Sequence, residues 1–332
     1  MGVLLKGYWK IERNKMDAWQ FIHNKLSVEI EVALLYVLKS EGSSPGRQGF
    51  KMAVAADGTF CGTIGGGIME HKFVEMAKAE LQLQVPGAGI YTQVHNKTAA
   101  KNQSGMICSG EQTIFLYHMK NEDLNTVHTL TTSLSAHRNG RLKLTKDGIF
   151  FSPDIPSANY YFEQSEKDFL LIEKTGIKNK LHIVGGGHCA LALSKLMHEM
   201  DFYINVYDER AGLNTIEQNN FAHQTTILDS YADLAGIISG GDNEYVVIMT
   251  FGYRSDDVAL RAILSKRFKY LGMLGSKNKV EKMFAQYASE NIDIAALKNI
   301  RSPVGIQIKS QTAVEIAVSI AAEIIACKNK NQ

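Results

Sequence analysis

The chain has 332 residues, of which 45% are hydrophobic and 21% charged, and its formal net charge is only +2. This length is sufficient for two domains with buried cores, and the balanced composition excludes an intrinsically disordered protein. Lys and Arg are scattered along the chain. No nucleic-acid partner is expected, because nucleic-acid-binding proteins usually carry a basic stripe.

The four cysteines lie far apart and form no CxxC pair: Cys61, Cys108, Cys189 and Cys327. Structural zinc and a disulfide framework are therefore not expected. The most apolar stretch, 313–326, is interrupted by Glu315 and Glu323. It predicts an amphipathic or buried helix rather than a membrane span. The first ten residues have too short an apolar run for a signal peptide, so we expect a soluble, cytoplasmic protein without a membrane partner.

The first half mixes helix and strand signals without a regular β-α-β rhythm. Helices are expected at 17–26, 68–83 and 121–136, and strands at 32–38, 51–55, 59–63, 90–94 and 113–117, with a hairpin over 141–152. Residues 1–150 therefore predict an N-terminal mixed α+β domain. The polar segments SPDIPSAN and EKTGIKNK predict a linker over 151–178.

Residues 179–332 alternate short apolar strands with helices. Strands are expected at 181–184, 203–207, 225–228, 245–250 and 270–273, and helices at 188–200, 257–266, 278–290 and 313–326. This alternation predicts an α/β domain, a Rossmann-like doubly wound parallel sheet covered on both faces.

A glycine turn between the first strand and helix of that domain fits the pattern GxGxx[G/A], with Gly185, Gly187 and Ala190 at its key positions. The turn and the following helix N-terminus are suited to a phosphate group. Asp208 ends the next strand, where such folds place a ribose-binding carboxylate. His188 is either an acid–base group at this site or a capping and packing residue. The whole turn predicts a phosphate-bearing ligand.

Further candidates lie in other loops. Gly66 and Gly67 form a second strand-to-helix turn that suits an anion, with Glu70 in the first helical turn, although a plain tight turn is an equal interpretation. Arg47 and Ser276 lie in loops that suit an anion or phosphate. Cys108 lies among small residues, and a thiolate suits molybdenum or copper better than magnesium. No Ser-His-Asp set, zinc helix or Walker lysine loop is present, so no catalytic residue is assigned.

Several motifs occur in an order that resembles the XdhC/CoxI family of xanthine dehydrogenase accessory factors. They are EGSSPGRQGFKM, GTIGGGIME, GMICSGEQTIF, IVGGGHCALAL, VYDER, YLGMLGSKNK and IRSPVGIQIKSQTAVEIAVSIAAEII. The resemblance implies a cytoplasmic, dimeric chaperone that binds the molybdenum cofactor (molybdopterin) and supports its sulfuration. It also implies partners: an apo molybdenum hydroxylase that receives the cofactor, a cysteine desulfurase and a second copy of the chain.

The chain departs from the family pattern at three positions. Ile68 stands where the family commonly has Cys, Ser109 replaces a Gly, and Phe251 follows Thr250 where the family often has His. Two alternatives to a non-enzymatic chaperone remain open. One is an NAD(P)-dependent oxidoreductase, for which Asp208 favours NAD over NADP. The other is a non-catalytic Rossmann-type ligand sensor.

Overall fold

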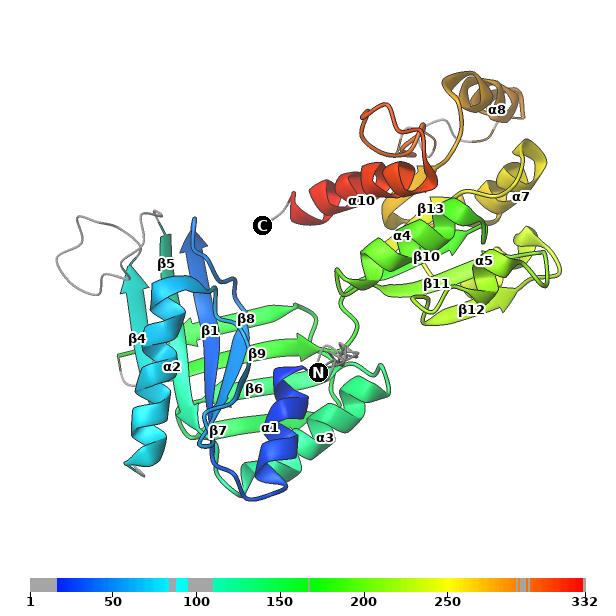
Figure 1. Ribbon diagram of the computed structural model, residues 1–332. Helices are drawn as coiled ribbons and strands as arrows, with labels where there is room; N and C mark the ends of the chain where they lie inside the picture. The colour runs from blue at the N-terminus through cyan, green and yellow to red at the C-terminus, as the bar shows by residue number, and fades with distance from the viewer. Residues whose placement is uncertain are drawn as a thin grey trace, which may run out of the picture. The chain divides into compact units, whose positions relative to one another are not determined.

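The structure is a computed structural model (Figure 1). It describes residues 17–83, 88–94, 110–166, 168–290, 292, 297 and 299–330. The chain divides into two compact units, Met1–Gly176 (unit 1) and Ile177–Gln332 (unit 2). Each unit has its own sheets and its own buried core.

The first sheet of unit 1 is antiparallel, in the order β3-β2-β1-β5-β4. Its strands are β1 (Val32–Gly42), β2 (Lys51–Ala55), β3 (Phe60–Gly62), β4 (Ala88–Val94) and β5 (Gly110–His118). Helix α2 (Gly67–Gln82) covers one face of this sheet (Figure 1). Alternate residues of β1 face α2 or the opposite core, because successive strand side chains point to opposite faces.

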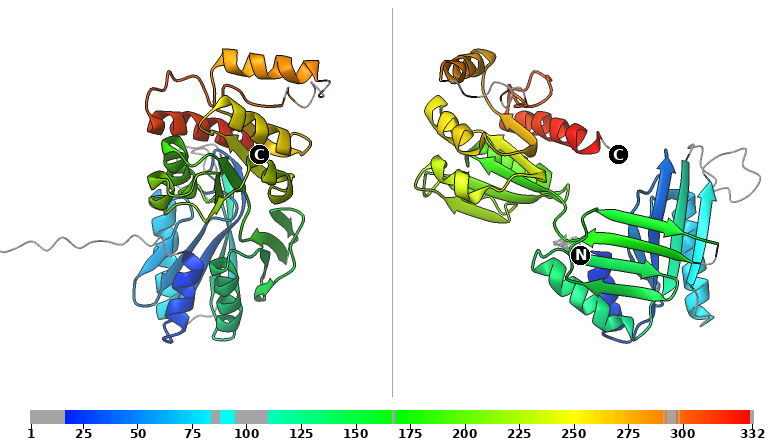
Figure 2. Two further views of the ribbon diagram at one scale, coloured as in Figure 1. Left: turned by 90° about the vertical axis from the view of Figure 1, so that its right-hand side faces the viewer. Right: turned by 180° about the vertical axis from the view of Figure 1, so that it is seen from behind.

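A second antiparallel sheet, in the order β7-β6-β9-β8, packs against the other face. Its strands are β6 (Gly140–Thr145), β7 (Gly148–Ser152), β8 (Tyr160–Gln164) and β9 (Phe169–Thr175). Helices α1 (Ala18–Leu26) and α3 (Asp123–Ser135) pack side by side against the same core (Figure 2). The N-terminal domain is therefore mixed α+β, as predicted.

The structure does not have the linker that the sequence predicts over 151–178. Strand β9 pairs with β6 as well as with β8, so 160–175 lies inside unit 1 and the division falls after Gly176. Phe169 and Leu171 are buried in the core of unit 1. The alternation of buried and half-buried residues along β9 was hidden among charged residues of the same segment.

Unit 2 contains a five-stranded parallel sheet in the order β12-β11-β10-β13-β14. Its strands are β10 (Lys180–Val184), β11 (Tyr203–Asp208), β12 (Gln224–Ile227), β13 (Gly241–Ile248) and β14 (Phe268–Met273). The α/β doubly wound sheet that the sequence predicts is confirmed.

Helices cover both faces of this sheet (Figures 1 and 2). Helices α4 (His188–His198) and α10 (Ala313–Asn329) pack on one face. The other face carries α7 (Tyr253–Ile263) and α8 (Lys277–Ser289), together with the short elements η1 (Tyr231–Asp233) and α6 (Leu234–Ile237). Helix α5 (Asn214–Glu217) follows β11. Within the described residues, no helix is long and apolar enough to cross a membrane.

Candidate functional site

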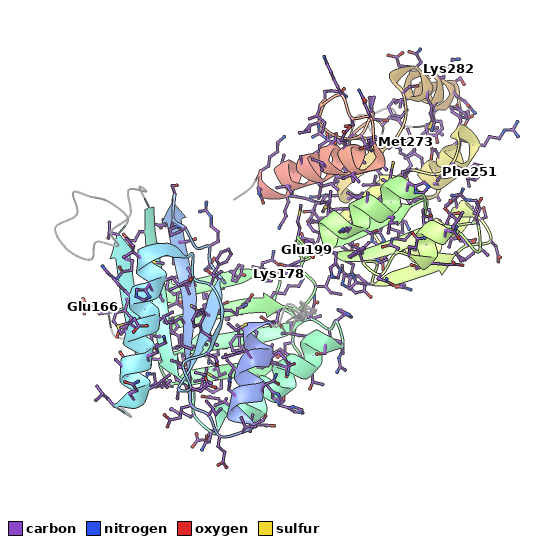
Figure 3. The ribbon with its side chains drawn as sticks, viewed as in Figure 1. Glu166, Lys178, Glu199, Phe251, Met273 and Lys282 are labelled. Carbon is purple, nitrogen blue, oxygen red and sulfur yellow. The ribbon has the colours of Figure 1, made fainter. Side chains whose placement is uncertain are left out.

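The carboxyl edge of the sheet in unit 2 gathers the loops that carry half of the predicted site residues. Because the strands are parallel, the turns after β10, β11, β13 and β14 meet at one edge, where open α/β sheets bind ligands. Figure 3 labels Met273 and Phe251 at this end of unit 2, whereas Glu199, at the C-terminus of α4, lies at the opposite end.

The glycine turn after β10 has a different constraint at each glycine. Gly185 has φ +111°, and a Cβ there would lie 2.4 Å from the Met249 carbonyl oxygen. A Cβ on Gly186 would lie 2.6 Å from Ile216 Cδ1, whereas one on Gly187 would meet nothing within 4 Å. Gly185 and Gly186 are therefore glycines for packing reasons. At Gly187 the backbone faces open space, which is what a phosphate approaching the main chain requires.

Helix α4 begins directly after this turn, with Gly187 as its N-cap residue. In the described part of the chain, no side chain caps this terminus. The first N–H groups of a helix have no intrahelical partners and lie at the positive end of its dipole. His188 is exposed in the first turn. This terminus therefore suits an anionic group.

Asp208 lies at the end of β11 and is 0% exposed. Its Oδ1 accepts hydrogen bonds from the backbone N–H and Nε of Arg210, at 2.9 and 2.8 Å. Its Oδ2 accepts from the Gly186 backbone N–H at 2.7 Å and from Arg210 Nη2 at 2.8 Å. Burial acts to raise the pKa of Asp208, but these hydrogen bonds outweigh it and hold the pKa below its usual value. Asp208 therefore ties the glycine turn to the loop that follows β11.

Arg210, the partner of Asp208, was not singled out from the sequence. Its guanidinium lies 5.0 Å from the centre of the Phe251 ring, and Phe251 is 65% exposed. The Arg210 side chain is 39% exposed. The signal that could have identified it is its position two residues after the strand-end carboxylate. Together Arg210 and Phe251 form a cationic and aromatic surface at the carboxyl edge.

A buried ion pair joins α7 and α8, the helices that follow β13 and β14. Asp256 is 0% exposed, accepts from the backbone N–H and hydroxyl of Thr250, and pairs with Lys279 of α8. Ser276, a predicted phosphate contact, instead caps α8 by accepting from the Lys279 backbone N–H. Neither Asp256 nor Lys279 was singled out from the sequence. This pair fixes the edge of the site, and the Ser276 hydroxyl is already engaged.

In unit 1, two loops that are far apart in sequence pack backbone to backbone. A Cβ on Gly46 would lie 2.0 Å from the Ile64 carbonyl oxygen, so only glycine fits there. The buried Gln112 donates through Nε2 to the carbonyls of both Gly46 and Ile64, at 3.1 Å each. Gln112 was not singled out from the sequence. It joins the EGSSPG loop to the glycine triplet.

The glycine triplet is held by Glu70 of α2. Glu70 Oε2 accepts from the Thr63 hydroxyl at 2.5 Å, from the Ile64 N–H at 2.8 Å and from the Gly66 N–H at 3.0 Å. The amide of Gly66, expected to face an anion, is thus occupied by the protein's own carboxylate. Gly67 is the first residue of α2.

Arg47 Nη1 donates to the Gly42 carbonyl at 3.0 Å and closes its own loop, although the residue remains exposed. Cys108 lies outside the described residues. Gly110, two positions further on, packs against the backbone of Ser43 and Ser44. Among the described residues, no group of three His, Cys, Asp or Glu side chains is placed to hold a metal ion.

Comparison with known proteins gives two family matches, one in each unit. Residues 27–90 match the XdhC and CoxI family, and residues 181–324 match the XdhC Rossmann domain. The chain is 25% identical over 302 residues to the uncharacterized protein YqeB of Escherichia coli K12. That alignment covers 90% of this chain but only 43% of YqeB. The chain is also 22% identical over 322 residues to a probable xanthine dehydrogenase subunit of Bacillus subtilis 168, covering 90% and 94% of the two chains.

A crystal structure of a xanthine dehydrogenase from Bacillus halodurans has the same fold. The TM-score is 0.71 at 22% sequence identity, and the match covers 95% of this chain and 97% of that one. The ordered motifs, the Rossmann sheet and the two matches agree with one another. The chain therefore belongs to the XdhC and CoxI family.

Proposed function

We propose that this protein is an accessory factor of a xanthine dehydrogenase-type molybdenum hydroxylase. It binds the molybdenum cofactor, supports the sulfuration of its metal and delivers it to the apo-enzyme. The observation that carries the proposal is the family match in both units, over 27–90 and 181–324. The relative from Bacillus subtilis is itself a probable xanthine dehydrogenase subunit.

The carboxyl edge of unit 2 fits one part of this cargo, the phosphate group. The amide of His188 at the uncapped start of α4 lies beside the open space at Gly187. A phosphate bound there gains the helix dipole and unpaired N–H donors. Arg210 supplies a fixed positive charge at the same edge.

The metal end of the cargo requires a soft ligand, and Cys108 is the residue proposed for it. A thiolate is a suitable ligand for molybdenum. Of the other cysteines, Cys61 and Cys189 are half-buried, and burial raises the pKa of both thiols. A thiol with a raised pKa supplies less thiolate at neutral pH. This supports Cys108 over these two cysteines.

The roles of the partners follow from the proposal. The protein acts as a carrier rather than as an enzyme: it binds the cofactor, excludes water from it and releases it. The source of sulfur is a cysteine desulfurase, and the recipient is the apo-hydroxylase. We propose that the protein is a homodimer that acts in the cytoplasm. Light scattering of the purified protein tests the oligomeric state, and cell fractionation tests the location.

The decisive experiment compares the wild type with Cys108→Ala and Cys61→Ala, all purified from a molybdate-fed host. Metal analysis and pterin fluorescence give the cofactor content, and reactivation of an apo-hydroxylase gives delivery. We expect molybdenum and pterin in equimolar amounts with the wild-type chain, retained in Cys61→Ala and lost in Cys108→Ala. A wild-type protein that carries neither molybdenum nor pterin and reactivates nothing refutes the proposal.

A further inference from the structure

The carboxylate of Asp208 has no capacity left for a ribose hydroxyl. A carboxylate offers about four lone-pair positions. The Gly186 N–H and the three donors of Arg210 occupy four, and the residue is 0% exposed. An unphosphorylated adenosine ribose is normally held through its hydroxyls by this carboxylate. The carboxylate that usually binds the ribose of NAD is therefore occupied by donors of the protein itself.

The guanidinium of Arg210 retains donors for a ligand. A guanidinium has five N–H groups, and two of those of Arg210 bind Asp208. The other three bind no described residue, and the side chain is 39% exposed. Contact with the Phe251 ring and the two bonds to Asp208 fix the orientation of the guanidinium plane. A preoriented, exposed guanidinium is the group best suited to bind a phosphate through two parallel hydrogen bonds.

A buried tyrosine, Tyr231, contacts the loop that follows β11. Tyr231 is 0% exposed, and its Oη has no hydrogen-bond partner among the described residues. Its backbone N–H donates to Glu209, which lies between Asp208 and Arg210 in sequence. Burial and the charge of Asp208 both raise the pKa of Tyr231. Buried polar atoms without a partner call for an explanation, and a missing ligand or ion is one.

We propose that unit 2 binds an adenine dinucleotide whose adenosine ribose carries a phosphate, the NADP type, and discriminates against NAD. The pyrophosphate lies at Gly187 and the first turn of α4, and Arg210 binds the ribose phosphate. Asp208 acts as a positioning residue that holds Arg210 against the glycine turn. The sequence-based preference for NAD is thereby reversed.

This proposal goes beyond the accessory role and does not depend on it. Both proposals place a phosphate at Gly187, the first turn of α4 and Arg210, so NADP and the phosphate end of the molybdenum cofactor compete for this site. The metal end of the cofactor is assigned to Cys108, which the NADP proposal does not use. The two proposals use different residues for their decisive variants, Arg210 for the dinucleotide and Cys108 for the metal. The two failures are therefore distinguishable.

The test is calorimetric titration of the full-length protein with NADP⁺ and with NAD⁺. The same titrations with 2′-phospho-ADP-ribose and ADP-ribose omit the nicotinamide. We expect each phosphorylated ligand to bind at least about tenfold tighter than its unphosphorylated counterpart. This difference corresponds to the free energy that charge-assisted hydrogen bonds to one phosphate contribute. Arg210→Gln removes the guanidinium and frees the carboxylate of Asp208. This variant should therefore bind NADP⁺ more weakly and NAD⁺ more tightly than the wild type, and the preference for NADP⁺ should disappear.

Arg261→Gln is the matched control. Arg261 also pairs with a carboxylate, Asp257, and also lies over an aromatic ring, that of Tyr287, but it is in the last turn of α7. The Arg261→Gln variant is expected to keep the wild-type preference for NADP⁺ over NAD⁺. If the Arg210→Gln variant does not fold, Arg210→Lys replaces it. This variant keeps the positive charge but lacks the paired N–H donors, so its preference for NADP⁺ over NAD⁺ should be smaller than that of the wild type.

Three outcomes overturn the proposal. They are equal or tighter binding of NAD⁺ by the wild type, an unchanged preference in both Arg210 variants, and no binding of either dinucleotide. Competition by inorganic phosphate as effective as that by 2′-phospho-ADP-ribose also overturns it, because the site then recognises an anion and not a nucleotide.

Discussion

The bond between Tyr36 and Glu173 links the two sheets of unit 1 and is the most informative one to remove. Tyr36 lies in β1 and is 0% exposed, and its hydroxyl donates to Glu173 Oε2 of β9 at 2.5 Å. Burial and the charge of Glu173 both raise the pKa of Tyr36 well above its usual value, so it remains a donor. In Tyr36→Phe, Tyr160 and Lys51 still contact Glu173. The substitution therefore removes one donor without isolating the carboxylate.

The expected loss follows from the type of bond. A buried hydrogen bond to a charged group contributes about 2 kcal/mol to the free energy of unfolding. For a unit of this size each kcal/mol corresponds to about 2–4 °C, so the melting temperature of unit 1 should fall by about 4–8 °C. Tyr161→Phe is the matched control, because Tyr161 donates to Glu163 on the same strand but is 50% exposed. Its loss should stay below about 0.5 kcal/mol.

Tryptophan fluorescence during urea and thermal unfolding measures this effect. The two tryptophans of the chain, Trp9 and Trp19, both precede residue 177, and Trp19 is 1% exposed in the core of unit 1. The fluorescence signal therefore reports unit 1 and not unit 2. Equal losses in Tyr36→Phe and Tyr161→Phe, or a loss below about 0.5 kcal/mol in the former, would refute the reasoning.

The remaining predictions concern unit 2. Gly185→Ala should destabilise it by about 2–4 kcal/mol in chemical denaturation, because φ is +111° and the Met249 carbonyl is too close. Gly187→Ala should unfold at the wild-type temperature but weaken dinucleotide binding in calorimetry, because the new methyl group occupies the ligand's space. Lys279→Met should cost about 3–5 kcal/mol in the same denaturation assay, because it leaves the buried Asp256 charge without its ion-pair partner. Because the folded pKa of Asp208 is lowered, its contribution to stability is present well above the unfolded value of 3.8. That contribution is lost as the pH falls through the lower folded pKa, and Asp208→Asn should remove this part of the acid dependence measured by circular dichroism. An unchanged acid profile in that variant would contradict the assignment.

Most elements of unit 2 could be predicted because their signals are local. Each buried parallel strand is a short apolar run, and each helix has its own apolar stripe. The turn from Gly185 to Gly187 could be predicted because its first two positions have no room for a side chain and therefore require glycine. Strands β8 and β9 were missed because β6, which pairs with β9, is distant in sequence and because both strands carry charged residues.

The sequence by itself determined the family, the two-domain architecture and the presence of a glycine turn suited to phosphate, since these depend on local pattern and motif order. Only the tertiary structure decided which hydrogen bonds each polar group makes. Glu70 accepts a hydrogen bond from the amide of Gly66, and the carboxylate of Asp208 accepts hydrogen bonds from Gly186 and Arg210. A carboxylate has the same letter in the sequence whether it faces a ligand or the protein's own backbone. Its capacity for a ligand is set by donors that folding brings from distant parts of the chain.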